Sequence, residues 1–129
     1  IDEMAKFQQY SFVCAPSMAQ AGLVGAFNVD MSGVVNHFER RRDMVREAFD
    51  GVANISDCRG AFYAFVEVPP ALGMSATEFC DLAITHNVVT IPGSVFSERD
   101  THIRLSFACP DEQLTEGLAI LRSLMQSAG

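Results

Sequence analysis

The segment from His102 to Phe107 constrains the fold most strongly, because apolar and polar residues alternate along it without a break. One side of this segment would carry Ile103, Leu105 and Phe107, and the other would carry His102, Arg104 and Ser106. A period of two residues is that of a β-strand with one buried face. The apolar side of such a strand has to be covered, so the rest of the chain must supply a layer that packs against it.

Amphipathic helices are predicted on both sides of this strand in the sequence. Apolar residues recur every three to four positions over residues 30–51, 75–87 and 110–125, as in helices that bury one side. A shorter helix, weakened by two glycines, is predicted for residues 17–27, after an irregular stretch over residues 1–16. These helices are the layer that would cover the sheet.

Two further strands are predicted for residues 61–68 and 88–91, which are rich in aromatic and β-branched side chains and end at prolines. A weak strand over residues 52–56 would add an edge. The predicted fold is therefore α/β, in a two-layer α+β arrangement, with a small mixed sheet covered mainly on one face by helices.

Composition excludes several classes of function. With 129 residues, 49% of them hydrophobic, the chain can form a core without disulfides or metals. It has 16 Asp and Glu against 9 Lys and Arg, a net charge of −7. Binding to nucleic acid needs many basic groups near phosphates, so nucleic acid is not an expected partner. Arg40, Arg41 and Arg42 are interleaved with acidic residues, and we interpret them as a solvated, salt-linked helix face.

Cysteine usage and hydropathy point to a reduced, cytoplasmic protein. The four cysteines are far apart in the sequence and include no Cys-x-x-Cys pair or zinc-type spacing with histidine. No metal site is therefore expected. No apolar stretch reaches the 18 residues of a membrane span, because charged or polar residues interrupt each one, so no membrane partner is expected either.

Arg104 is the residue around which chemistry is most easily built. On the polar face of its strand, its fork of donors could bind a carboxylate through two parallel hydrogen bonds. An arginine on a solvated sheet face is the other interpretation, and the sequence pattern alone favours it. Likewise, the Pro92-Gly93 turn before Phe96 could form the wall of a pocket beside Arg104 or be a plain connection.

The motifs around Arg104 resemble a known family. The runs are Ile91-Pro92-Gly93-Ser94-Val95-Phe96, Arg104-Leu105-Ser106-Phe107-Ala108 and Gly60-Ala61-Phe62-Tyr63-Ala64-Phe65, with Arg41-Arg42-Asp43 and residues 9–16 upstream. In order and spacing they are similar to the C-terminal part of class I pyridoxal-phosphate-dependent aminotransferases of the aspartate aminotransferase type, which have fold type I. The resemblance spans nearly the whole chain. It implies a C-terminal small domain over residues 31–129, preceded by a tail of the large domain and interdomain segment over residues 1–30.

The resemblance also implies roles for single residues. Arg104 would bind the α-carboxylate of the substrate, and Phe62 would lie near the substrate. Pro92, Gly93 and Phe96 would shape the wall around it. The resemblance gives no catalytic residue and no cofactor-binding residue in this chain.

The main feature of the family that this sequence lacks is the lysine that binds the cofactor. The family holds pyridoxal 5'-phosphate through a lysine, whereas Lys6 is the only lysine here and lacks the family's sequence context. The resemblance thus implies a parent enzyme that uses pyridoxal phosphate to move an amino group between an amino acid and a 2-oxo acid. The isolated chain is expected to be inactive and to hold no cofactor.

Two questions about partners and function stay open in the sequence. The family forms homodimers, and apolar residues within positions 1–30 predict self-association of the chain, namely Phe7, Tyr10, Phe12, Leu23 and Phe27. The alternative function is a non-catalytic, carboxylate-binding or regulatory α/β module. The sequence also does not separate a transaminase from other enzymes of fold type I.

Overall fold

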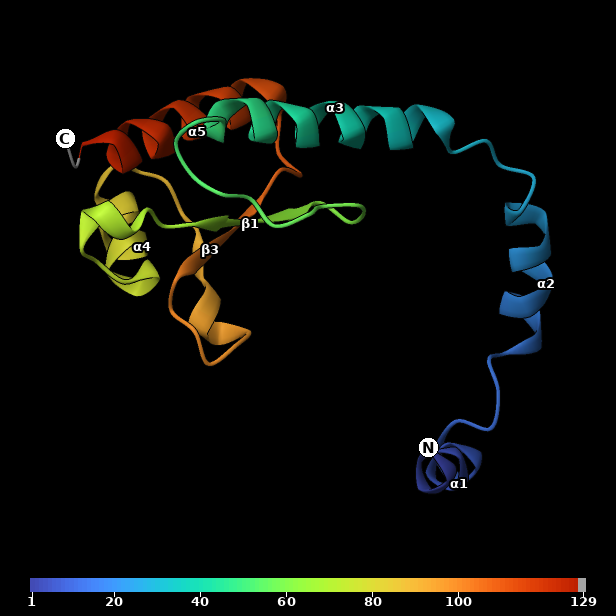
Figure 1. Ribbon diagram of the computed structural model, residues 1–129. Coiled ribbons are helices and arrows are strands. Elements are labelled where there is room, and N and C mark those ends of the chain that lie inside the picture. The colour runs from blue at the N-terminus through green and yellow to red at the C-terminus, as the bar shows by residue number, and fades with distance from the viewer. Residues whose placement is uncertain (128–129) are drawn as a thin grey trace. The chain divides into compact units, whose positions relative to one another are not determined.

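The computed structural model describes residues 1–127 of the chain, which divide into two compact units. The first unit is Ile1–Gly33, and the second begins at Val34, within the first turn of helix α3. The unit that begins at Val34 contains the sheet and its covering helices (Figure 1).

The first unit consists of two helices, α1 (Asp2–Ser11) and α2 (Ser17–Ala26), neither of which has a buried residue. The prediction of an irregular stretch over residues 1–16 was wrong for α1. Its first turn carries Asp2 and Glu3, which suit the positive end of the helix dipole. Lys6 forms an ion pair with Glu3 one turn away, a further local contribution to the helix.

The second unit contains a three-stranded sheet, three α-helices and two short 3₁₀ helices. In chain order the elements are α3 (Ser32–Phe49), β1 (Tyr63–Glu67), the 3₁₀ helix η1 (Pro70–Leu72), α4 (Ala76–Thr85), β2 (Ile91–Pro92), the 3₁₀ helix η2 (Gly93–Val95), β3 (His102–Ser106) and α5 (Asp111–Gln126). The α/β fold class predicted from the sequence is confirmed, as are its three main helices.

The sheet has the order β1-β3-β2, and β3 pairs with both neighbours in antiparallel register. The expectation of a mixed sheet was therefore wrong for the described strands. β1 and β2 run in the same direction, but β3 lies between them, so no two neighbouring strands of residues 1–127 are parallel. Arg104 of this central strand lies opposite Phe65 on one side and Ile91 on the other.

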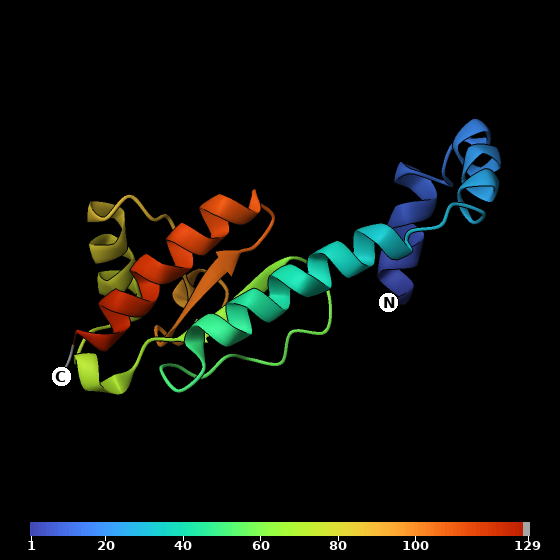
Figure 2. The ribbon, with the colours of Figure 1, turned by 90° about the horizontal axis from the view of Figure 1, so that it is seen from above.

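One face of the sheet packs against the helices, and the other does not. The alternation predicted for β3 is present, because Ile103 and Leu105 are buried while His102 and Arg104 are partly exposed. A single core joins the buried strand residues to one side of α3, α4 and α5, with these members from the helices: Val45, Phe49, Ala76, Phe79, Cys80, Ala83, Leu114, Leu118, Leu121 and Met125. Above the sheet, α3 and α5 lie side by side and run in the same direction (Figure 2).

Two strands are shorter than the sequence predicts, for local reasons. The predicted strand 88–91 is reduced to Ile91–Pro92, because the residues that cap α4 after its end at Thr85 reach as far as Val88. Asn87 adopts a left-handed φ of 62°, and the Val88 amide donates back to the Ala83 carbonyl, which gives a Schellman-type helix end. β1 begins at Tyr63 rather than Ala61, because Ala61 also has a left-handed φ, of 59°.

The other predictions for this unit have clear outcomes. Ser75 and Glu78 form a capping box at the start of α4, as their spacing predicts. The weak strand expected at 52–56 is a single bridge between Ile55 and Val66. All four cysteines are free. Within residues 1–127, no helix is both long and apolar enough to cross a membrane.

Candidate functional site

Arg104 occupies the centre of the uncovered face of the sheet. The alternation along β3 directs its side chain away from the core, opposite to Ile103 and Leu105. Among the described residues, no carboxylate lies within ion-pair distance of its guanidinium group. Glu67, on the same face of β1, instead accepts a hydrogen bond from Asn54 at 2.6 Å. The positive charge of Arg104 is therefore available to a ligand from outside the described part of the chain.

Aromatic rings surround this guanidinium group. Its central carbon, Cζ, lies 4.4 Å from the centre of the Tyr63 ring and 4.1 Å from the centre of the Phe96 ring. Phe96 is in turn edge-on to Phe65, with 5.8 Å between the ring centres. We call Tyr63, Phe65 and Phe96 the aromatic clamp. It forms because β1 lies on one side of β3, while the segment after β2 lies on the other.

The Pro92-Gly93 turn brings Phe96 to this position. Pro92 pairs with Ile103 at the end of β2, and Gly93 opens the 3₁₀ helix η2. A Cβ atom at Gly93 would lie only 2.7 Å from the backbone oxygen of His102, so no larger residue fits without movement of the backbone. The amide of Phe96 donates to the carbonyl oxygen of Gly93 at 2.8 Å. Phe96 thus lies on the Arg104 side of the sheet, and Gly93 starts the turn that leads to it. Pro92, as the register partner of Ile103, shares the covered side with that residue.

Phe62, also named from the sequence, occupies a different place. It precedes β1 and packs against Phe38 of α3 and against Tyr63, with ring centres 6.2 Å and 4.5 Å away. With Phe38 and Phe107 it lines an apolar cavity of about 390 Å³. It is Tyr63, not named from the sequence, that contacts Arg104. Tyr63 shares its strand face with Phe65, the register partner of Arg104, but this register is not visible in the sequence.

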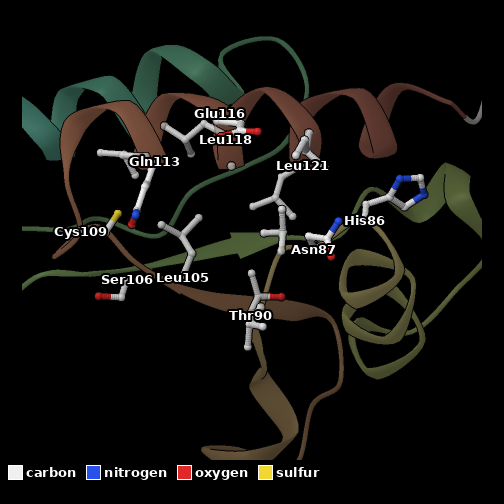
Figure 3. Close-up of a pocket in the computed structure, with 15 residues that line it drawn as sticks. His86, Asn87, Thr90, Leu105, Ser106, Cys109, Gln113, Glu116, Leu118 and Leu121 are labelled. Atoms are coloured by element: carbon white, nitrogen blue, oxygen red, sulfur yellow. The ribbon is translucent and has the colours of Figure 1, made fainter.

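A second cavity, of about 520 Å³, lies on the covered side of the sheet between α5, the end of β3 and residues 86–90 (Figure 3). Leu105 lines it, whereas the neighbouring Arg104 projects from the other face. Thr90 lies at this cavity and shares a hydrogen bond of 3.2 Å with the Cys80 thiol, whose pKa is raised by burial. This cavity is separate from the Arg104 site, and the Cys80 side chain beside it is buried in the core.

The described residues do not fit pyridoxal phosphate. The amine of Lys6 is exposed on α1 and donates to the carboxylate of Glu3 at 2.9 Å. It belongs to the first unit, whereas the Arg104 site belongs to the second. Among residues 1–127 there is also no cluster of three His, Cys, Asp or Glu side chains able to hold a metal ion. The arrangement around Arg104 is suited to binding an anion and provides no electron sink of its own.

Known proteins match the chain along almost its whole length. YugH of Bacillus subtilis, a protein named as an aminotransferase, is 35% identical over an alignment of 130 positions that covers 96% of this chain and 33% of that protein. The aspartate aminotransferase of Thermotoga maritima is 30% identical over 126 residues, which are 96% of this chain and 32% of that protein. The crystal structure of an aspartate aminotransferase from Thermotoga maritima matches with a TM-score of 0.77 at 31% identity, over 95% of this chain and 32% of that one.

The chain belongs to the fold type I aminotransferase family, as its C-terminal small domain. This membership agrees with the resemblance found in the sequence motifs around Arg104. The small domain spans about one third of the length of the relatives that it matches. No profile of a known protein family matches the chain.

Proposed function

We propose that this small domain binds the α-carboxylate of an amino acid or 2-oxo acid through Arg104, in a larger enzyme that transfers amino groups. The observation that carries the proposal is an arginine on an uncovered sheet face, between two aromatic rings and without an acidic partner among the described residues. A carboxylate matches the planar donor fork of arginine with two parallel, charge-assisted hydrogen bonds.

Arg104 acts in this proposal by binding and orientation. Because the guanidinium group fixes the carboxylate end of the substrate, rotation about that end is restricted, and the bond to be broken is held in one direction. Phe96 and the turn at Pro92 and Gly93 would form the wall around the substrate, whereas Phe62 packs toward Phe38 of α3. Because the bound substrate is already restricted in this way, it loses less entropy when it reaches the transition state of the reaction.

Pyridoxal phosphate is the cofactor of this family of aminotransferases, and the described residues of this chain do not provide a place for it. We therefore propose that the 129-residue chain is inactive alone and holds no cofactor specifically. The homodimer and the cytoplasmic location expected from the sequence remain predictions. Residues 1–30 as a tail of the large domain and interdomain segment also remain a prediction.

The test is to replace Arg104 by lysine in the complete polypeptide that carries this domain. Arg104→Lys keeps the positive charge but removes the two-pronged donor fork, so kcat/KM for amino acid substrates should fall on the order of 100-fold or more. Arg99→Lys is the matched control, because Arg99 is exposed in the loop before β3. An unchanged kcat/KM for Arg104→Lys would refute the role of Arg104.

The alternative is a non-catalytic module that binds carboxylates. It uses the same observation, because Arg104 would hold an anion in either case. A complete polypeptide that binds 2-oxo acids in an Arg104-dependent manner, but transfers no amino group with any amino acid offered, would favour this alternative.

A further inference from the structure

The aromatic clamp has a feature that anion binding alone does not require. Tyr63 comes from β1 and Phe96 from the segment after β2, so the two rings approach Arg104 from the two neighbouring sides of β3. Both ring centres lie within 4.5 Å of the guanidinium carbon. At this distance the negative face of an aromatic ring attracts the cation. A flat guanidinium group can stack on such rings, whereas a lysine ammonium cannot.

Each ring is itself held in place by other parts of the domain. Phe96 packs edge-on against Phe65, the register partner of Arg104, and its amide is bonded to Gly93. Tyr63 packs against Phe62, with 4.5 Å between the ring centres. The rings are still partly exposed, Tyr63 by 37% and Phe96 by 47%, so the clamp covers the guanidinium group without sealing it from a ligand.

We propose that Tyr63 and Phe96 are positioning residues, which hold the guanidinium plane of Arg104 between their rings and leave its donor edge as the direction of approach for a carboxylate. That the ligand is a carboxylate rests on the proposed function, whereas the contact between the two rings and Arg104 is independent of that function. Preorganisation of this kind improves affinity, because an arginine side chain otherwise loses rotamer freedom when it binds. It also restricts binding to a geometry in which both oxygens of the carboxylate lie in the guanidinium plane.

The proposal can be tested first on the free chain, with 15N-labelled arginine. Protons held against aromatic ring faces are shifted upfield in NMR spectra, so the Nε–Hε signal of Arg104 should lie upfield of the other arginines. Loss of this signal in Arg104→Lys assigns it. Tyr63→Leu and Phe96→Leu should each move the signal toward the common arginine position. Tyr63→Phe and Phe96→Tyr are the matched controls, because they keep a ring and should keep the shift.

A structural role alone predicts a different pattern. If the rings only stabilised the fold, the leucine variants would lower the melting temperature and leave the Arg104 signal in place in the folded protein. The signal is therefore read at a temperature at which circular dichroism shows each variant to be folded. An Arg104 signal at the common position in the unchanged chain, or one that does not respond to either leucine variant, overturns the proposal.

Titration with pyruvate then separates this proposal from the proposed function. Pyruvate should perturb the Arg104 signal, with a Kd that rises at least about fivefold in the leucine variants and changes less than about twofold in the ring-preserving ones. An equal Kd in all four variants overturns the positioning role. The Arg104 signal could depend on the rings and yet not respond to pyruvate. That result would support the contact between the rings and Arg104, but it would refute carboxylate binding, on which the proposed function is based.

Discussion

Gly93 shows how a single residue without a side chain can determine the geometry of a site. A methyl group at this position would approach a backbone oxygen, that of His102, which cannot rotate away as a flexible side chain could. We expect Gly93→Ala to lower the free energy of unfolding by about 1–3 kcal/mol, because β2 and the start of β3 would have to separate. It should also displace Phe96 from Arg104.

Urea unfolding of the chain measures this effect, and Gly117→Ala is its control. Gly117 lies within α5, and a Cβ atom there would meet no heavy atom within 4 Å. Because glycine is a poor helix former, Gly117→Ala should stabilise the chain by about 0.5–1 kcal/mol. Opposite signs for the two glycine-to-alanine changes are expected. Equal effects would mean that the close approach at Gly93 costs nothing.

At the same scale, the sequence places Arg104 correctly and expects Phe96 near it, but does not identify the contact with Tyr63. Strict alternation over residues 102–107 is enough to put Arg104 on the uncovered face. The contact with Tyr63 depends on the register between β1 and β3, which alternation within one strand does not specify. The contact with Phe96 depends on the path of the chain through η2. Tertiary geometry therefore determines which aromatic residue meets the arginine.

Among the elements, α3 and α5 are linked by a contact that the sequence does not predict. The basic run on α3 was interpreted as a salt-linked face of one helix, and Arg42 does pair with Asp43 and Glu39. Arg40 and Arg41, however, both pair with Asp111, the first residue of α5, each at 2.7 Å. Asp111 follows Arg40 by 71 positions and Arg41 by 70, so only the packing of the two helices brings the partners together.

We expect these ion pairs between α3 and α5 to make the stability of the chain depend on pH in the acidic range. The hydrogen bond from Arg41 holds the pKa of the Asp111 carboxyl below its ordinary range. The contribution of Asp111 is therefore fully present above its unfolded pKa, near pH 4, and is lost as the pH falls through the lower folded value. Asp111→Asn should lower the melting temperature at pH 7, and the difference from the unchanged chain should shrink below pH 4.

Glu112→Gln is the matched control for Asp111→Asn. Glu112 follows Asp111 in the same first turn of α5 and is exposed, and among the described residues it has no ion pair with an arginine. Glu112→Gln should change the melting temperature at pH 7 less than Asp111→Asn does. Both carboxylates interact favourably with the positive end of the helix dipole, but only Asp111 also pairs with arginines of α3. If both variants lose the same stability at pH 7, the link to α3 contributes nothing.

For the whole chain, the sequence predicts the layers better than the pairing of strands. Helical and strand periods identify the covering helices and the half-buried strand, because burial imposes these periods locally. Whether a neighbouring strand is parallel or antiparallel depends on long-range topology, and the predicted mixed sheet was wrong in this respect. Helix α1 was missed although its apolar residues favour one side of the helix, and it has no buried residue in this structure.

The first unit leads to the last prediction, that the chain associates with itself through residues 1–29. No residue of α1 or α2 is buried, and Tyr10 and Phe27 are 89% and 82% exposed. Exposed apolar side chains in such numbers favour association, because contact between copies removes them from water. Sedimentation velocity should show a larger species for the chain than for a form that lacks residues 1–29. This deletion keeps Asp30, which accepts hydrogen bonds from Ser32 at the start of α3.

A second variant of the chain separates the effect of the apolar side chains on association from the effect of shortening the chain. The triple variant Phe7→Gln, Phe12→Gln, Phe27→Gln keeps all 129 residues but removes three exposed rings from the first unit. It should sediment as the smaller species, like the deletion, since association depends on apolar area rather than on chain length. A chain that is monomeric before any change, or a triple variant that still associates like the unchanged chain, would contradict the prediction.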